Sequence, residues 1–174
     1  YFAKSNVYMK ISQIKNAKTS LEAGLKIDPK NHKAIFQLGN ILLMEKKYSE
    51  AIKIFDKSIE IKPNFWQAIN NKGLASFEKN NVDLSMELFE KAISIEDNAE
   101  PLLGLASCLR IKDIKLALQL AKKALIKDPR YVNFDYRKEQ LWGENLQLST
   151  EILLQNDQLQ TDVMLAKSKI NASS

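Results

Sequence analysis

Residues of the same kind recur every 34 positions through much of this 174-residue chain. Ile27, Ile61 and Ile95 show the interval twice in succession. Seven further pairs share it: Pro29 with Pro63, Ala34 with Ala68, Ile35 with Ile69, Gly39 with Gly73, Phe55 with Phe89, Lys57 with Lys91, and Ile59 with Ile93. A fixed period of this length predicts a solenoid, in which each unit packs on its neighbours and stacking creates one continuous core.

The composition favours helices as the building blocks of these units. Five glycines and four prolines are too few for a fold of many short strands and turns. No run approaches the roughly 20 apolar residues that cross a bilayer, and the start shows no signal-peptide pattern. We therefore expect a cytoplasmic protein with no membrane segment in this chain, although a start at Tyr1 rather than Met leaves open a removed leader or anchor.

The residues inside each period resemble the tetratricopeptide repeat, whose pattern is W-x2-L-G-x2-Y, A-x3-F and then Pro over 34 residues. The best copy spans residues 32–65, with Leu38-Gly39, Ala51, Phe55 and Pro63 at the pattern positions. Residues 66–99 form a degenerate copy that ends in Asp97 instead of proline. A copy at residues 1–31 starts inside its first helix. One at residues 100–133 is about two residues short, which we expect in the turn between its helices.

The resemblance implies an all-α fold, a right-handed superhelix of about four helical hairpins followed by C-terminal capping helices. The solenoid is expected over residues 1–133, with units at about 1–31, 32–65, 66–99 and 100–133. Residues 134–170 leave the pattern as amphipathic segments and are expected to cap the last hairpin. Within them, residues 137–155 are similar to the caps of some cyanobacterial and plastid tetratricopeptide proteins. Residues 171–174 are expected to be a frayed tail.

No catalytic or metal-binding constellation is visible in the sequence. With one histidine and one cysteine, the sequence offers no structural zinc set and no convincing Cys–His pair. His32 is expected at the surface near a helix start, and Cys108 in the core. The phosphate-binding and nucleophile motifs GxxxxGK[ST], GxGxxG and GxSxG are absent from the sequence. We expect a protein that is not an enzyme and needs no cofactor or metal.

The net charge of +5 does not indicate a nucleic-acid partner, because it is not one continuous stripe. Residues 1–31, 32–65, 66–99, 100–133 and 134–174 carry +4, +2, −3, +4 and −2. Most of the basic residues are lysine rather than arginine, the side chain best suited to phosphate.

The resemblance also implies a concave groove lined by the first helix of each hairpin. The expected binding residues for a peptide or partner helix are Phe2, Asn6, Met9, Lys33, Phe36, Gln37, Asn40, Leu43, Met44, Gln67, Asn70, Asn71, Leu74 and Phe77. Their apolar members would form a stripe suited to an amphipathic helix or an extended apolar segment. The asparagines could bond a peptide backbone without demanding a sequence. From the fourth unit, Glu100, Leu103, Ser107 and Arg110 would join the groove.

The sequence does not fit one subfamily of tetratricopeptide proteins. Tetratricopeptide co-chaperones that grip the acidic C-termini of heat-shock proteins use a clamp of lysine, arginine and two asparagines. Asn40 and Asn71 match its asparagines, but Phe36, Glu100 and Gly104 occupy the cationic positions. A C-terminal carboxylate would therefore find no counter-charge.

We predict a non-enzymatic scaffold that binds a peptide or partner helix of unknown identity in this groove. The groove could instead be filled by the chain's own terminus or by a second copy. A separate alternative is a structural module that self-assembles through its N-terminal edge, stacking on another copy or on missing repeats. Another alternative is an RNA-binding helical repeat, which would show steep salt dependence.

Overall fold

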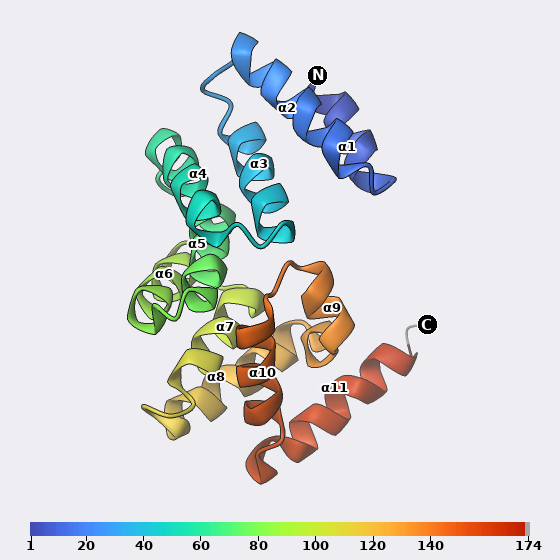
Figure 1. Ribbon diagram of the computed structural model, residues 1–174. Coiled ribbons are helices and arrows are strands. Elements are labelled where there is room, and N and C mark those ends of the chain that lie inside the picture. The colour runs from blue at the N-terminus through green and yellow to red at the C-terminus, as the bar shows by residue number, and fades with distance from the viewer. Residues whose placement is uncertain (173–174) are drawn as a thin grey trace.

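The computed structural model describes residues 1–172, apart from the side chain of Lys10, and every regular element in that range is helical (Figure 1). Four antiparallel hairpins stack in order along a right-handed superhelix. They are formed by α1 (Phe2–Lys10) with α2 (Ile14–Ile27), α3 (His32–Met44) with α4 (Tyr48–Ile61), α5 (Trp66–Glu78) with α6 (Val82–Ile95), and α7 (Ala99–Leu109) with α8 (Ile114–Lys127). Each second helix packs on the first helix of the following hairpin, which confirms the predicted solenoid.

The turns inside the first three hairpins have the same backbone conformation. Ser12, Lys46 and Asn80, which are 34 residues apart, have φ values of 57°, 57° and 60°. The fourth turn, residues 110–113, has no positive φ. The fourth copy is short because α7 has 11 residues where α3 and α5 have 13. The expectation that the turn itself is shortened is therefore wrong.

Glycines on the first helices make room for phenylalanine rings. An added Cβ at Gly39 would lie 2.4 Å from Phe55 Cε1, and one at Gly104 would lie 2.7 Å from Phe89 Cζ. Both rings are fully buried. The glycine and phenylalanine positions of the repeat are thus in direct contact, both within and between units.

The C-terminal segment has two parts with different positions. It comprises η1 (Pro129–Val132), α9 (Phe134–Glu139), α10 (Glu144–Leu154), η2 (Asp157–Leu159) and α11 (Gln160–Ala172). α11 packs on α8 and η1, where a cap of the last hairpin is expected. α10 instead packs on α7 and α5, which are both first helices and so belong to the concave side (Figure 1).

The predicted frayed tail is wrong for Asn171 and Ala172, which belong to α11, while residues 173–174 lie outside the described range.

A buried arginine holds this segment together. Arg137 of α9 is 0% exposed and donates from Nε to Gln147 Oε1 at 2.8 Å and from Nη1 to the Tyr131 carbonyl at 2.7 Å. Its Nη2 also forms an ion pair with Glu151 of α10. One guanidinium thereby joins η1, α9 and α10.

The lone cysteine and the lone histidine lie close to where the sequence predicts them. Cys108 is buried on α7, and burial raises the pKa of its thiol to about 12. His32 begins α3, with its ring half-buried edge-on against Phe65 at 5.1 Å between centroids. Helices in the described range are all too short or too polar to cross a bilayer.

Candidate functional site

The C-terminal segment covers the concave surface of the fourth unit. Ser107 of α7 and Thr150 of α10 share a hydroxyl hydrogen bond of 2.7 Å, and Ser149 Oγ donates to the Ser107 carbonyl at 2.8 Å. Arg110 Nε in turn donates to Ser149 Oγ at 2.9 Å, and Leu103 is 0% exposed. Glu100, Leu103, Ser107 and Arg110, expected to line the groove, are therefore engaged by the chain's own C-terminal segment.

The third unit holds the start of α10 through one carboxylate. Glu78 Oε1 accepts from the Leu146 amide at 2.9 Å, and its Oε2 accepts from the Asn145 amide at 3.2 Å. These amides lie at a helix N-terminus, where an anion is stabilised. Burial nevertheless raises the pKa of Glu78, and the two amide bonds oppose that shift. Lys46 adds an ion pair to Glu144 at 2.5 Å.

Gly143 is required for this capping contact, and we expect Gly143→Ala to lower the free energy of unfolding by about 1–2 kcal/mol. An added Cβ would lie 2.2 Å from Glu78 Cδ, so the carboxylate would have to leave the helix start. Urea unfolding of Gly143→Ala, Glu78→Ala and the double variant measures the coupling. The two losses should be strongly non-additive; simple addition would contradict the contact.

The predicted apolar stripe is partly buried. Leu74 is 1% exposed, so the expectation that it faces an open groove is wrong. Leu43 is 5% exposed and lines, with Met44, a second pocket between α3 and the segment from α9 to α10. Four others are half-buried by packing. Phe2 covers Gly24, Met9 packs against the core between the first two hairpins, Phe36 packs on Phe55 and Phe65, and Phe77 packs against the core that includes α10. Met44 remains exposed, as does the polar residue Lys33.

The predicted amides bond one another across the first helices. Gln37 Nε2 donates to Asn6 Oδ1 at 2.7 Å, which links α3 to α1. Asn71 Nδ2 donates to Asn40 Oδ1 at 2.8 Å, and Asn70 Nδ2 donates to Asn71 Oδ1 at 3.0 Å. Asn70 is 0% exposed. These residues therefore hold the hairpins in register, and part of their hydrogen-bonding capacity is used internally.

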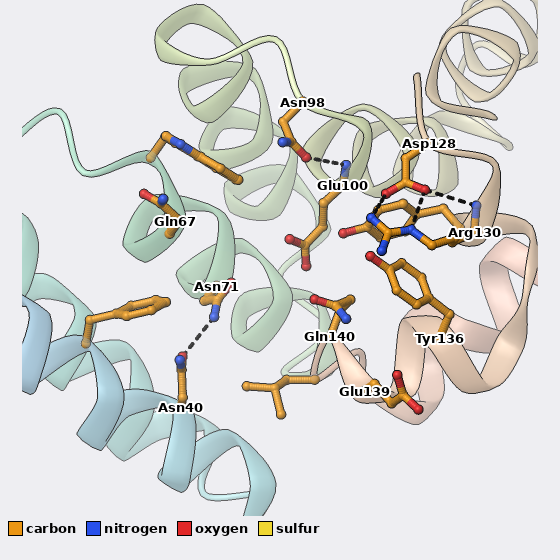
Figure 2. Close-up of a pocket in the computed structure, with 14 residues that line it drawn as sticks. Asn40, Gln67, Asn71, Asn98, Glu100, Asp128, Arg130, Tyr136, Glu139 and Gln140 are labelled. Atoms are coloured by element: carbon orange, nitrogen blue, oxygen red, sulfur yellow. Dashed lines mark hydrogen bonds and ion pairs between the residues drawn. The ribbon is translucent and has the colours of Figure 1, made fainter. Parts of the chain in front are cut away.

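An open pocket of about 420 Å³ remains where the first helices meet the C-terminal segment (Figure 2). One wall comes from α3, α5 and α7 and the other from η1, α9 and the loop that follows α9. Its lining residues are Phe36, Asn40, Trp66, Gln67, Asn71, Asn98, Glu100, Asp128, Arg130, Tyr131, Tyr136, Glu139, Gln140 and Leu141. Four of the fourteen predicted groove residues, namely Phe36, Asn40, Gln67 and Asn71, are brought together here.

Glu100 projects from α7 into the middle of this pocket, between Asn71 and Tyr136 (Figure 2). Its Oε1 accepts from Trp142 Nε1 at 3.1 Å. Burial raises the pKa of the carboxyl to about 7, against smaller opposing effects of hydrogen bonds from Trp142, Asn70 and Tyr131. A carboxyl in this setting exchanges its proton near neutral pH.

Because the pKa of Glu100 is higher in the folded chain than its unfolded value near 4.5, the ionised carboxylate destabilises the fold. The stability that Glu100 contributes is therefore fully present below pH 4.5 and is lost as the pH rises through about 7. Glu100→Gln removes this pH-dependent loss. Between pH 4 and pH 8, the difference in unfolding free energy between Glu100→Gln and the parent chain should therefore shift by about 2–3 kcal/mol in favour of the variant. Urea unfolding at both pH values measures the difference. A pH-independent difference would contradict the shift; Glu90→Gln, on the exposed face of α6, is the matched control.

Sequence reasoning missed the second wall of the pocket. Trp142, Gly143 and Arg137 lie outside the 34-residue period, so no repeat position marked them. The available signal was the Trp-Gly pair between two amphipathic segments, which indicates a fixed turn rather than a loose linker. Within residues 1–172, no group of three His, Cys, Asp or Glu residues could hold a metal ion.

Comparisons with known proteins agree with this architecture. Tetratricopeptide repeat profiles match residues 1–31, 32–65 and 67–98, which together exceed half of the chain. The tetratricopeptide repeat-containing protein trd-1 of Caenorhabditis elegans is 27% identical over 127 residues. That match covers 72% of this chain, which spans only 16% of the length of trd-1.

Solved structures share the fold at low sequence identity. MamA superposes with a TM-score of 0.71 at 17% identity, covering 99% of this chain and 98% of that one. YrrB, described as a TPR protein with an unusual peptide-binding site, gives a TM-score of 0.66 at 17% identity, covering 98% and 90%. A thermophilic TPR protein of Thermus thermophilus, TTC0263, gives 0.64 at 15%, covering 85% and 78%. With its matched repeats and its stacked hairpins, the chain belongs to the tetratricopeptide repeat family.

Proposed function

We propose that this chain is a scaffold that binds an extended peptide in the pocket between its first helices and its own C-terminal segment. The fold supports protein–protein interaction in general. The observation that supports a specific place is the open pocket of about 420 Å³, bounded by α3, α5 and α7 on one side and by η1 and α9 on the other.

The chemistry of the pocket suits a polypeptide backbone. Asn40, Gln67, Asn71, Asn98 and Gln140 place amide groups around the space, and each can donate to a carbonyl or accept from an N–H. Trp66 and Gln67 make no side-chain hydrogen bond within the described part of the chain, and both are half-buried. They are therefore available to a guest.

An extended peptide fits better than a helix. A helix with its side chains is about 10–12 Å across and needs a wide apolar groove. Here α10 already covers the concave side of α7 and part of α5. The pocket proposed for the peptide is lined mainly by polar side chains. YrrB, which shares the fold, is described as having an unusual peptide-binding site, and that description is compatible with this proposal.

Peptides selected against the purified chain from a random display library test the proposal. The variant Trp66→Ala with Gln67→Ala removes two side chains whose loss leaves no described hydrogen bond broken. Phe36→Ala with Asn40→Ala is a poorer probe, because Phe36 packs on Phe65 and Asn40 pairs with Asn71.

Selected peptides should lose at least about tenfold in affinity for the Trp66→Ala, Gln67→Ala variant. The control Glu87→Ala, Glu90→Ala on the exposed face of α6 should bind as the parent does. Equal affinity for the parent and the pocket variant, or no selected binder at all, would contradict the proposed function.

A further inference from the structure

The residues that line the pocket carry more acidic than basic side chains. Arg130 is already committed to Asp128, through Nε to Oδ1 at 2.9 Å and Nη2 to Oδ2 at 2.7 Å. Its guanidinium also stacks on the Tyr136 ring at 4.7 Å. Glu100 and Glu139 therefore have no cation among the described lining residues to pair with. Glu139 is exposed, but Glu100 is half-buried, and a half-buried carboxylate without a counter-ion is unfavourable.

The surroundings of Glu100 suit a cation. Trp142 Nε1 donates to one carboxylate oxygen of Glu100. The carboxyl group points into the pocket (Figure 2). Trp66 lines the same space with a half-buried indole that stacks on no other ring in the described chain. Aromatic faces attract guanidinium and ammonium groups, and a carboxylate completes such a site. Neighbouring amide oxygens can accept the remaining N–H bonds of a guanidinium.

We propose that this pocket binds a positively charged side chain, arginine or lysine, of the partner polypeptide, with Glu100 as its counter-ion and Trp66 as the aromatic surface beside it. The inference deepens the proposed function and rests on it. Arginine fits best, because its planar group can stack on the indole and still bond the carboxylate. A guest cation supplies the charge that the pocket lacks.

Binding should also depend on pH, because the cation favours ionised Glu100. The groups that face Glu100 are Tyr131 from η1, Tyr136 from α9, and the Asp128–Arg130 pair, with Glu139 also in the lining. The described lining residues from α3 and α5 are not titratable. Burial raises the pKa of both tyrosines, so they stay neutral, and Asp128 stays ionised because hydrogen bonds and charge from Arg130 hold its pKa below the usual range. Affinity should therefore rise from pH 5 to pH 8 in the parent and not in Glu100→Gln.

Two matched small probes test the charge requirement on the full chain. Nα-acetyl-arginine amide carries the guanidinium, and Nα-acetyl-citrulline amide has nearly the same shape without the charge. The indole N–H signals of Trp66 and Trp142 report binding by NMR. At pH 7.5 the arginine probe should shift both signals saturably and bind about tenfold or more tightly than the citrulline probe. Glu100→Gln should reduce that preference to less than threefold, and Glu90→Gln should leave it unchanged.

A pentapeptide, acetyl-Gly-Leu-Arg-Leu-Gly-amide, and its citrulline counterpart identify the source of the cation. Tighter binding of the arginine pentapeptide than of the single-residue probe supports a polypeptide side chain. Equal affinity assigns the pocket to a small free cation and overturns the polypeptide inference. Equal binding of arginine and citrulline probes overturns the charge requirement. If selected peptides still depend on Trp66 and Gln67 in that case, the proposed function survives and only this inference fails.

Discussion

Arg137→Ala is expected to lower the free energy of unfolding by about 3–5 kcal/mol, because it empties a fully buried site and leaves two acceptors without their donor. The guanidinium is fully buried and bonds the Tyr131 carbonyl, Gln147 and Glu151. Without it, the carbonyl and the Gln147 oxygen lose their partner inside the protein, and the space left is not refilled. Arg137→Lys should recover only part of the loss, because an ammonium cannot reproduce the planar fork.

Chemical denaturation with urea at neutral pH measures these values. The matched control is Arg130→Ala, which breaks an ion pair to Asp128 at the surface and should change stability by at most about 1 kcal/mol. A loss for Arg137→Ala no larger than for Arg130→Ala would show that the guanidinium does not anchor the C-terminal segment.

Phe89→Ala is expected to cost about 3–5 kcal/mol, the range for deleting a buried aromatic ring. The ring lies between two units, since added Cβ atoms at Gly73 and Gly104 would lie 3.0 Å and 2.7 Å from it. Deleting it should weaken both its own hairpin and the contact between the third and fourth units. In a solenoid, stability depends on such contacts between neighbours, so the two ends should also begin to unfold separately.

Urea transitions followed by circular dichroism and by tryptophan fluorescence should coincide in the parent and separate in Phe89→Ala. Ile126→Ala, at a side chain that is 59% exposed, is the control and should stay within about 0.5 kcal/mol. Coincident transitions with a loss below about 1 kcal/mol would contradict the role of Phe89 in coupling the units.

The repeat architecture could be predicted from the sequence because each unit is specified locally. Pro29, Pro63 and Pro129 each follow the last residue of a helix by two positions, since proline cannot continue the preceding helix. Gly39 and Phe55 occur in one unit and touch in the structure. Small and large residues at a fixed interval therefore indicated both the fold and its principal contacts.

The concave surface could be predicted only in part. The first helices do carry Asn40, Gln67 and Asn71 on the pocket side. The covering of Leu74 and Leu103 by α10, however, depends on contacts such as Glu78 with the amides of Asn145 and Leu146, 67 and 68 residues apart. Contacts between residues so far apart cannot be inferred from a 34-residue period. The sequence also does not distinguish the buried Arg137 from an exposed charge on a short amphipathic helix.

Hydrogen exchange of the full chain, with and without a selected peptide, tests the central claim most directly. If the peptide binds between the first helices and the C-terminal segment, it should slow exchange in the first turn of α5 and in residues 136–142, which form opposite walls of the pocket. Helices α6 and α8 should be unaffected. Slower exchange confined to α1 and α2, or to α11, would place the partner elsewhere and contradict the account.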